Sequence, residues 1–509
     1  MSGAGSGTRP EVRAPAGAVR GLRETGVAVF RGIPFAQPPV GALRFAAPHG
    51  IPGWGDERRD AASYGPPPPQ RANLGAEATT SDGADDEWLT LNVWTPDPVA
   101  GAGLPVMVWV QGGGYQFGTS GLPEYDGARL ARSGVVVVTF NYRVGAEGFA
   151  LVEGAPANRG LLDQVAALGW VRDNIAPFGG DPDRVTVFGE SAGGGSVASL
   201  LAMPRAAGLF RRAVVQSMPG TFFAPELAKE IADALAAGIG VRPTVAELAT
   251  LAPNVLSAAG DGLGVTMPEH ADRWGPAARR RIPFSPVVDG DVLPATPWQA
   301  LADGAGRGVE LLVGHTRDES RLFTAIEGLL GEVGDELAEE ALDHFAPGPD
   351  GLRRYREAFP AAGPDELYEL VGSDWLFRMP SLHLAEAQVG GGGRAHVYEL
   401  AWPAPGMGGA LGACHGLDVP LVFGNLDRGQ PAVLIGSPPS QEAEAVSDRM
   451  RNAWVSFASD GEPGWPAYDA AGRLTQVFDA EPQVTTYPER RSRRIWADHT
   501  FAALGPVGR

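Results

Sequence analysis

Apolar residues up to Gly220 form two patterns, short continuous runs and runs of helical spacing. Leu104–Val110 and Val135–Tyr142 are almost continuously apolar, as is typical of strands buried on both faces of a sheet. Between Asn158 and Asn174, apolar side chains recur every three or four residues, which indicates a helix. Because strands of this kind alternate with helices, we expect an α/β fold with a large, mostly parallel central sheet flanked by helices.

The pattern changes in the second half of the chain. Pro225–Leu251 and Ile326–Phe359 are rich in Ala, Glu and Leu, and this composition favours helices. Val309–Val313 and Arg394–Leu400 are strand-like and return the chain to the sheet. We therefore expect helices inserted between strands, where they can cap a site at the edge of the sheet.

We place these helical caps around residues 222–285 and 320–390. Residues 1–10 contain several Gly and Ser residues and no apolar run, which indicates a flexible tail. Residues 11–509 contain no linker long enough to separate two domains, and we expect them to form a single domain.

Composition and charge narrow the range of partners. The chain has 509 residues, 44% of them hydrophobic, and a net charge of -19. This acidic excess argues against a nucleic-acid or membrane partner, because nucleic acids and anionic lipids both attract clustered Lys and Arg. The N-terminus has no apolar signal segment, and no apolar run approaches the roughly 18 residues of a membrane span. Since Cys414 is the only cysteine, no intrachain disulfide can form, and the expected location is the cytoplasm.

One segment carries a motif with a clear chemical meaning. Gly189–Gly193 fits the G-x-S-x-G pattern and lies between the strand-like Arg184–Phe188 and a helical stretch that ends at Ala202. In this context a tight turn from strand to helix exposes the serine hydroxyl at the edge of the sheet. Ser191 is therefore the candidate nucleophile, and it needs a base within hydrogen-bond reach to become reactive.

The base and the residue that orients it are expected further along the chain, in the order serine, acid, histidine. Of the eight histidines, His415 is the best placed, because it ends a Gly-, Ala- and Pro-rich loop after the strand-like Arg394–Leu400. The loop after Val309–Val313 offers two adjacent carboxylates, Asp318 and Glu319. Spacing alone does not choose between them, and either could be an exposed turn residue.

A glycine triplet supplies the remaining requirement of acyl transfer. Gly112–Gly114 follows the expected central strand Leu104–Val110. Because no Cβ intervenes, its N–H groups can approach a reacting carbonyl and, with the N–H of Ala192, hold an oxyanion. The competing interpretation is a mobile turn. A phosphate loop is excluded, since no Gly-Lys-Ser/Thr follows the triplet.

In combination, these motifs resemble the type B carboxylesterases, the α/β-hydrolase branch that includes bacterial para-nitrobenzyl esterases and the cholinesterases. The resemblance extends from about Gly17 to Tyr487. The segments that carry it, in chain order, are Phe30–Phe45, Leu89–Pro96, Gly112–Gly114, Gly160–Pro182, Phe188–Gly194, Pro286–Gly290, Asp318–Glu319, His415 and Val422–Gly424. So many motifs of one family rarely occur in the same order by chance.

The resemblance implies an α/β-hydrolase fold and a role for each candidate residue. It makes Ser191 the nucleophile, Glu319 the acid and His415 the base of a catalytic triad. It also implies an oxyanion hole formed by three N–H groups, those of Gly113, Gly114 and Ala192. The implied reaction is hydrolysis of a small-molecule ester, mainly a neutral one, through an acyl-enzyme, and it requires no metal or organic cofactor.

Three positions depart from the family pattern. Gln111 stands where many bacterial relatives have His and some cholinesterases have Tyr, so the entry to the glycine loop is neutral. Trp88 replaces a cysteine that forms a disulfide in the animal members. Ser320 follows Glu319 where Gly is usual, which leaves the acid in place.

Other interpretations of the same residues stay open. The triad could act on amides, carbamates, thioesters or lactones, or the chain could be a non-catalytic, cholinesterase-like binding protein. Cys414 is a weaker candidate nucleophile, because it lacks the turn that exposes Ser191. The sequence is compatible with both a monomer and a homodimer.

Substrate preference is the least constrained property. Five side chains that follow the expected strands could line an apolar pocket or belong to the core, namely Tyr115, Phe117, Met218, Phe222 and Phe223. The Pro-rich and acidic segment Tyr64–Glu87 predicts a long loop with a functional or mobile role. Its acidic half favours neutral or cationic esters over anionic ones, unless it is simply a solvated acidic face.

Overall fold

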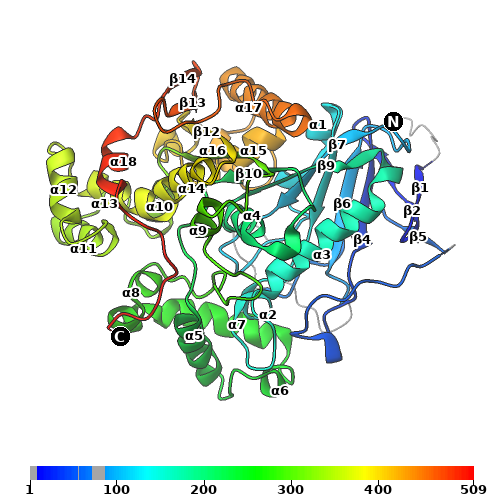
Figure 1. Ribbon diagram of the computed structural model, residues 1–509, viewed down its shortest axis with the longest axis horizontal. Helices are drawn as coiled ribbons and strands as arrows, with labels where there is room; N and C mark the ends of the chain where they lie inside the picture. The colour runs from blue at the N-terminus through cyan, green and yellow to red at the C-terminus, as the bar shows by residue number, and fades with distance from the viewer. Residues whose placement is uncertain (1–8, 56, 71–85, 509) are drawn as a thin grey trace.

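The computed structural model describes residues 9–55, 57–70 and 86–508. Within these residues an eleven-stranded sheet runs through the centre, and helices cover both of its faces (Figure 1). In spatial order its strands are β14 (Gln483–Thr486), β13 (Leu474–Phe478), β12 (Arg394–Leu400), β11 (Glu310–Thr316), β10 (Arg212–Gln216), β9 (Gly180–Glu190), β7 (Leu104–Val110), β8 (Val136–Phe140), β6 (Thr90–Thr95), β4 (Val27–Pro34) and β3 (Leu22–Glu24). The α/β class expected from the sequence is confirmed.

The strands of the described sheet run mostly in one direction. The seven neighbours from β13 to β8 are parallel, whereas β14 at one edge and β6, β4 and β3 at the other are antiparallel. A small second sheet of β1 (Glu11–Ala14), β2 (Gly17–Arg20) and β5 (Arg58–Asp60) lies at the right in Figure 1. In a parallel sheet the carboxyl ends of all strands meet at one edge, where loops far apart in sequence come together.

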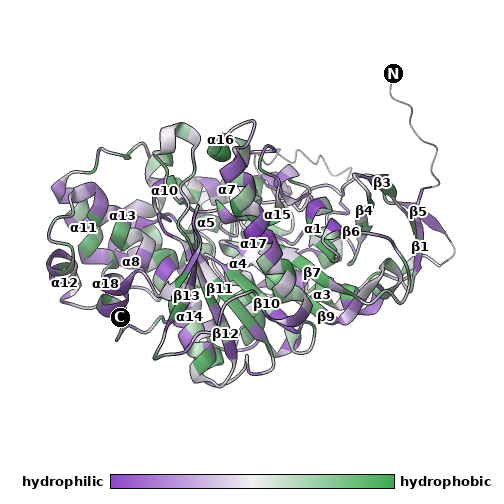
Figure 2. Cartoon of the chain, turned by 90° about the horizontal axis from the view of Figure 1, so that it is seen from above, coloured by the Kyte–Doolittle hydropathy of each residue, from purple (hydrophilic) through white to green (hydrophobic). Residues whose placement is uncertain are grey.

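Alternate residues of the central strands pack into different cores. In β7, Val106 and Val108 join side chains of α3 and α4 on one face, whereas Met107 and Trp109 join those of α15 and α17 on the other. The strands accordingly appear as continuous hydrophobic ribbons between helices in Figure 2. This two-sided burial explains why the strands were recognisable as uninterrupted apolar runs.

The helices form two groups. Those that follow or flank the strands are α1 (Ala128–Arg132), α2 (Gly145–Phe149), α3 (Arg159–Asn174), α4 (Ala192–Ala202), α9 (Pro297–Ala302), α15 (Asp418–Phe423), α16 (Pro431–Ile435), α17 (Gln441–Asp460) and α18 (Arg490–Trp496). Those in the two inserted stretches are α5 (Pro225–Gly238), α6 (Val245–Leu248), α7 (Pro253–Thr266), α8 (Ala271–Arg279), α10 (Arg321–Ile326), α11 (Asp335–Phe345), α12 (Gly351–Ala358), α13 (Pro364–Ser373) and α14 (Met379–Gly390), with a π-helical turn, η6 (Asp374–Arg378), before α14.

The two stretches expected to be helical in the insertions each contain more than one helix. Pro225–Leu251 is divided into α5 and α6, because Gly240 adopts a φ of 75° and Pro243 follows it. Ile326–Phe359 is divided into α11 and α12 at Pro347-Gly348-Pro349. Composition favours helix over each stretch, but Gly and Pro end the helices within it.

Two expectations fall mainly on residues that the structure leaves out. Residues 1–8 of the expected tail 1–10, and residues 71–85 of the acidic segment, lie outside the described residues. Arg9, however, is held in place, since its guanidinium bonds to the carbonyl oxygens of Arg20 and Gly21 and to the Asp60 carboxylate.

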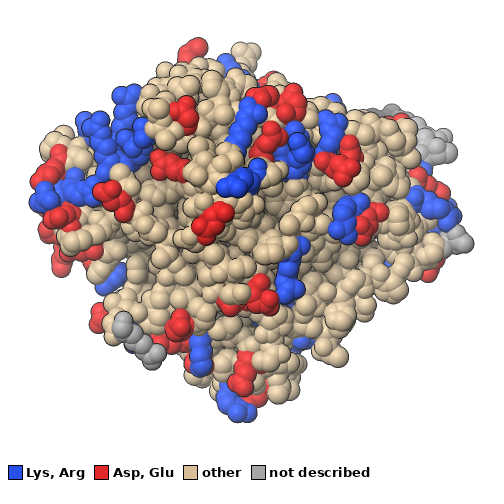
Figure 3. Space-filling view, viewed as in Figure 1, with Lys and Arg blue, Asp and Glu red and all other residues tan. Residues whose placement is uncertain are grey.

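Acidic and basic side chains are interspersed on the face in Figure 3, and Lys and Arg gather over α12 and α18. The net charge of -19 therefore produces no uniform acidic field on this face. In the part of the chain that the structure describes, no helix has the length and apolarity that a membrane span requires.

A buried ion pair joins the loop after β8 to α3. Arg143 and Asp163 are 1% and 0% exposed, and the guanidinium donates two hydrogen bonds to the carboxylate, at 2.7 and 2.8 Å. The backbone N–H of Arg143 donates a third, at 3.0 Å. Such a pair is held firmly only while both charges are present, because either one alone would be buried without compensation.

We expect Asp163→Asn to lower the free energy of unfolding by about 3–5 kcal/mol, because it leaves the Arg143 charge buried and unpaired. Urea denaturation followed by circular dichroism measures this change. The matched control is Asp173→Asn, at the exposed pair with Arg172, which should cost less than about 1 kcal/mol. Equal losses for the two variants would contradict the argument.

Candidate active site

The backbone turns sharply between β9 and α4, and Ser191 occupies this turn. Its φ of 59° and ψ of -126° are rare for residues with a side chain and cost about 1–3 kcal/mol. Two hydrogen bonds hold the turn, from Ser191 N–H to Gln216 O at 3.0 Å and from Gly195 N–H to Ser191 O at 2.9 Å. Ser191 is partly exposed while Glu190 and Ala192 are buried, so the turn presents its side chain outward.

Glycines on both sides of the turn let α4 approach the sheet. A Cβ atom at Gly193 would overlap the carbonyl oxygen of Val110 in β7. A Cβ atom at Gly189 would lie 2.7 Å from the backbone of Gly193, which is closer than atoms in contact can pack. Larger residues at either position would push the helix, and Ser191 with it, away from the sheet.

The glycine loop after β7 borders the same turn. A Cβ at Gly112 would lie 3.2 Å from the Cβ of Ser191, and Gly113 and Gly114 have φ values of 113° and 60° that favour glycine. Within the described residues, the N–H groups of Gly113, Gly114 and Ala192 donate to no acceptor. Three free donors therefore border the turn that carries Ser191.

His415 follows β12 and lies against the loop after β11. Its Nδ1 atom is 2.6 Å from Glu319 Oε2, and the Glu319 side chain is fully buried. The other carboxylate oxygen accepts the N–H of Thr316 at 2.9 Å. Because an ionised carboxylate only accepts hydrogen bonds, Nδ1 carries the proton, and Nε2 of a neutral ring is free to accept one.

The two adjacent carboxylates of this loop have different contacts. Asp318 Oδ2 accepts the N–H of Ala413 at 2.8 Å, and Asp318 N–H donates to Ala413 O at 2.9 Å. Asp318 thus ties the loop after β11 to the loop that carries His415, and Glu319 is the carboxylate bonded to the imidazole. The geometry therefore distinguishes two residues that spacing alone could not.

The opposite side of the imidazole faces Glu190, the residue before Ser191. His415 Nε2 lies 3.1 Å from Glu190 Oε1, yet within the described residues it has no hydrogen-bond partner, Ser191 included. Bonds between nucleophile and base are often long in an unliganded site and tighten when substrate binds. The ring nitrogen nevertheless points toward the turn that carries Ser191.

A third buried carboxylate contributes to the electrostatics of the site. Asp418, which begins α15, accepts hydrogen bonds from Gln216 Nε2 at 2.9 Å and from the Tyr398 hydroxyl at 2.8 Å. Burial raises the pKa of Asp418, and its charge in turn raises the pKa of His415. The imidazole is therefore influenced by three buried carboxylates, of which Glu319 alone bonds to it directly in the described structure.

Comparison with known proteins assigns the chain to one family, and the matched region contains all of these residues. The model of the carboxylesterase family matches residues 8–496. The chain belongs to the carboxylesterase family. It is 36% identical over 498 residues to the para-nitrobenzyl esterase of Bacillus subtilis. The aligned region covers 94% of this chain and 96% of that protein. It is 34% identical to the phenmedipham hydrolase of Pseudarthrobacter oxydans, over 91% of this chain and 94% of that protein.

Solved structures agree with this membership. A carboxylesterase from Geobacillus stearothermophilus matches with a TM-score of 0.83 and 36% identity, over 96% of this chain and 100% of that chain. A structure of a para-nitrobenzyl esterase also matches with a TM-score of 0.83 and 36% identity, over 96% and 99% of the two chains. This carboxylesterase is therefore a carboxylic ester hydrolase with the α/β-hydrolase fold, as the sequence motifs implied.

The negative charges of the neighbouring carboxylates raise the pKa of His415 in this carboxylesterase. Burial lowers the pKa of His415, but the carboxylates of Glu190 and Glu319 outweigh it and raise that pKa to about 9. Burial also raises the pKa of Glu190, to about 8, against the attraction of His415. The pKa of Glu319 is lowered, because the bonded imidazole outweighs the effect of burial. Glu319 thus remains the charged partner of the ring, whereas the raised pKa of Glu190 lets this carboxyl group take up a proton at a higher pH than Glu319 does.

Two aromatic residues from the second insertion enclose the imidazole. The ring of Phe377, in η6, stacks on His415 at 4.2 Å between centroids, and that of Phe323, in α10, lies at 5.2 Å. Sequence reasoning missed both, because no motif marks them. It also missed Glu190 and Asp418, although Glu190 is the variable residue of the G-x-S-x-G motif itself.

The five candidate pocket residues lie in different surroundings. Tyr115, Met218, Phe222 and Phe223 are at most 2% exposed and pack in the core. Phe117 lines a cavity of about 20 Å³, which has room for about one water molecule. Their role in binding substrate stays a prediction.

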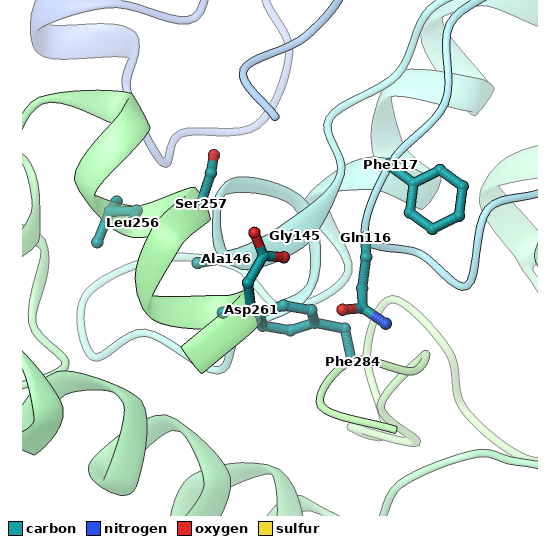
Figure 4. A pocket seen from close by; sticks show the side chains of 9 residues that line it. Gln116, Phe117, Gly145, Ala146, Leu256, Ser257, Asp261 and Phe284 are labelled. Carbon is teal, nitrogen blue, oxygen red and sulfur yellow. The ribbon is translucent and has the colours of Figure 1, made fainter. Parts of the chain in front are cut away.

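This small cavity lies between an inserted helix and the loop that continues from the glycine triplet. Gln116 of that loop, Gly145 of α2, Leu256 and Asp261 of α7, and Phe284 line it. Figure 4 shows the Asp261 carboxylate and the Phe284 ring between α7 and Gln116. Helix α7, from the first insertion, therefore lies beside Gln116, just after the glycine triplet.

Cys414 and Gln111 are both fully buried. Burial raises the pKa of the Cys414 thiol to about 12, so it is uncharged near neutral pH and a poor nucleophile. The side-chain amide of Gln111 has no hydrogen-bond partner in the described structure. The backbone carbonyl oxygen of Gln111 accepts a hydrogen bond from the Tyr142 hydroxyl at 2.7 Å. Among the described His, Cys, Asp and Glu residues, no group of three could hold a metal ion.

Proposed function

We propose that this carboxylesterase hydrolyses small to medium, mainly neutral esters with Ser191 as nucleophile, His415 as base and Glu319 as the acid that orients it. The observation that carries the proposal is the buried hydrogen bond of 2.6 Å between His415 Nδ1 and Glu319 Oε2. This bond directs Nε2 toward the Ser191 turn, where an accepting nitrogen is required.

Acylation begins when Ser191 Oγ attacks the ester carbonyl carbon. His415 Nε2 accepts the hydroxyl proton, and Glu319 stabilises the resulting imidazolium without accepting a proton itself. The carbonyl oxygen becomes an oxyanion, which the N–H groups of Gly113, Gly114 and Ala192 bind. The three donors need no rearrangement for this, since they have no acceptor among the described residues.

Collapse of this intermediate releases the alcohol, which takes the proton from His415. A water molecule then gives a proton to Nε2 and attacks the acyl carbon. As the second oxyanion collapses and the acid is released, His415 returns this proton to Ser191 Oγ. Phe323 and Phe377 keep the imidazole in an apolar environment, where its interaction with Glu319 is stronger than in water. The same aromatic surface supports a preference for neutral acyl groups.

We expect Ser191→Ala to lower kcat for p-nitrophenyl butyrate by a factor on the order of 10⁴–10⁶, because it removes the nucleophile and leaves only binding and the oxyanion donors. Initial rates of the purified protein measure this loss. Ser199→Ala, in the same helix but with its hydroxyl bonded to Gly195 O, is the control and should keep most of the activity. Near-normal turnover by Ser191→Ala would show that another residue is the nucleophile.

The pH dependence tests the charges around His415. Only the neutral imidazole can act as base, so kcat/KM falls as the pH falls through the pKa of His415. Since the neighbouring carboxylates raise this pKa from the ordinary 6.5 to about 9, we expect the acid limb of the profile to lie above pH 6.5. Glu190→Gln removes one of those charges, so the inflection should move to lower pH.

Glu226→Gln is the control for this shift. Glu226 is exposed in α5, and water screens its charge, so its removal should leave the inflection in place. An identical profile for Glu190→Gln and the native protein would mean that Glu190 does not raise the pKa of His415.

A further inference from the structure

A second, larger cavity lies among the inserted helices. Its volume is about 680 Å³, and it lies between α8, α11 and α13. These helices are neighbours at the left in both Figure 1 and Figure 2. Ser191, Glu319 and His415 do not line it. The volume is within the range of about 300–1,000 Å³ that is usual for small-molecule sites.

Arg280 is the central polar residue of this cavity. Its guanidinium lies over the ring of Phe345 at 4.5 Å and beside that of Tyr368 at 5.3 Å. Its Nη1 donates to the Tyr368 hydroxyl at 3.5 Å, while Nε and Nη2 are buried without a hydrogen-bond partner in the described structure. The two rings thus hold a planar cation in one orientation, and none of its N–H groups reaches a carboxylate within the described residues.

The inner end of this guanidinium is close to the candidate active site. A Cβ at Gly372 would lie 2.6 Å from Arg280 Nη2 and 2.7 Å from Ser320 Oγ. Ser320 directly follows Glu319 in the chain. Arg280 therefore reaches from the cavity toward the loop that carries the proposed acid.

With two further arginines, the residues that line the cavity have a net positive charge. Arg279 pairs with Glu340 at 2.5 Å, whereas the exposed Arg281 has no ion pair within the described residues. Burial lowers the pKa of His344, so this lining histidine is neutral near pH 7. Against three arginines, the lining contains two carboxylates, Glu340 and Glu327.

The position of Arg281 is unusual in itself. It lies two residues beyond the end of α8, directly after the C-cap residue Arg280, with a φ of 52°, where glycine is the common choice. An arginine there strains the backbone, yet it adds a cation at the rim of the cavity.

The remaining wall is apolar. Leu329, Leu337, Ala341 and Phe345 line the cavity together with the arginines. A cationic ligand would be repelled by Arg280 and Arg281, and a purely apolar one would leave the guanidinium without a partner. The lining therefore fits a ligand with one anionic group and a hydrocarbon body.

We propose that this cavity is a second ligand site, which binds small amphiphilic carboxylates with the carboxylate on Arg280 and the hydrocarbon on the apolar wall. Because Nε and Nη2 of Arg280 are buried, the carboxylate is attracted by the charge of the guanidinium and reaches it through Nη1, beside the Tyr368 hydroxyl. The acids released by ester hydrolysis belong to the same chemical class, and only this link rests on the proposed function.

Octanoate is the probe, with octanol as its uncharged counterpart. Isothermal titration of the native protein should show octanoate binding at least about tenfold tighter than octanol. Arg280→Met, which keeps the length of the side chain but removes the cation, should weaken octanoate binding by about tenfold or more. Arg353→Met, in exposed α12, should leave it unchanged. Equal affinity in the Arg280→Met and native proteins would overturn the proposal.

Two further measurements separate this site from the active site. The activity of Arg280→Met toward p-nitrophenyl butyrate should stay within about twofold of the native value, since Arg280 does not contact the proposed triad. A crystal of the native protein soaked in octanoate should show the carboxylate on Arg280, a result that does not depend on any variant folding. Octanoate found only beside Ser191, or nowhere, would contradict the second site and leave the proposed function intact.

Discussion

The close approach of α4 to the carboxyl ends of β7 and β9 is the constraint on which the candidate site depends. It is possible only because Gly189 and Gly193 lack side chains, since a Cβ at Gly193 would overlap Val110 O. The same approach leaves Ser191 in a strained conformation and brings the glycine loop against it. Ser191 and the N–H groups proposed to bind an oxyanion are therefore positioned by one packing contact, and the strain at Ser191 is offset by the extensive core on both faces of the sheet.

A second constraint is the burial of charge around a single imidazole. Glu190, Glu319 and Asp418 are buried with His415. A buried carboxylate is stable only when a cation or hydrogen-bond donors pair with its charge, or when a proton neutralises it. Glu319 bonds directly to the ring and stays ionised, whereas burial raises the pKa of both Glu190 and Asp418. The carboxylates thus differ in function because they differ in their contacts, not in their burial.

Much of the fold and the site could be predicted from the sequence, for physical reasons. The strands β7 and β8 are buried on both faces, so they are almost continuous apolar runs, and the turn at Ser191 needs glycines at fixed spacing. The choice between Asp318 and Glu319 could not be made from spacing, because adjacent residues of a loop differ only in which neighbour each one reaches. The contacts of Phe323 and Phe377 with His415 could not be predicted either. Both residues belong to an inserted stretch, and its composition predicts helices but not where those helices end or which side chains reach the imidazole.

The central claim is that Ser191, His415, Glu319 and the glycine loop act as one catalytic unit. Its most direct test is a crystal structure of the protein after reaction with a p-nitrophenyl alkylphosphonate, which mimics the tetrahedral intermediate. We expect a covalent bond from phosphorus to Ser191 Oγ, with the phosphoryl oxygen hydrogen-bonded to the N–H groups of Gly113, Gly114 and Ala192. Phosphorus bound to another residue, or a phosphoryl oxygen directed away from these donors, would contradict it.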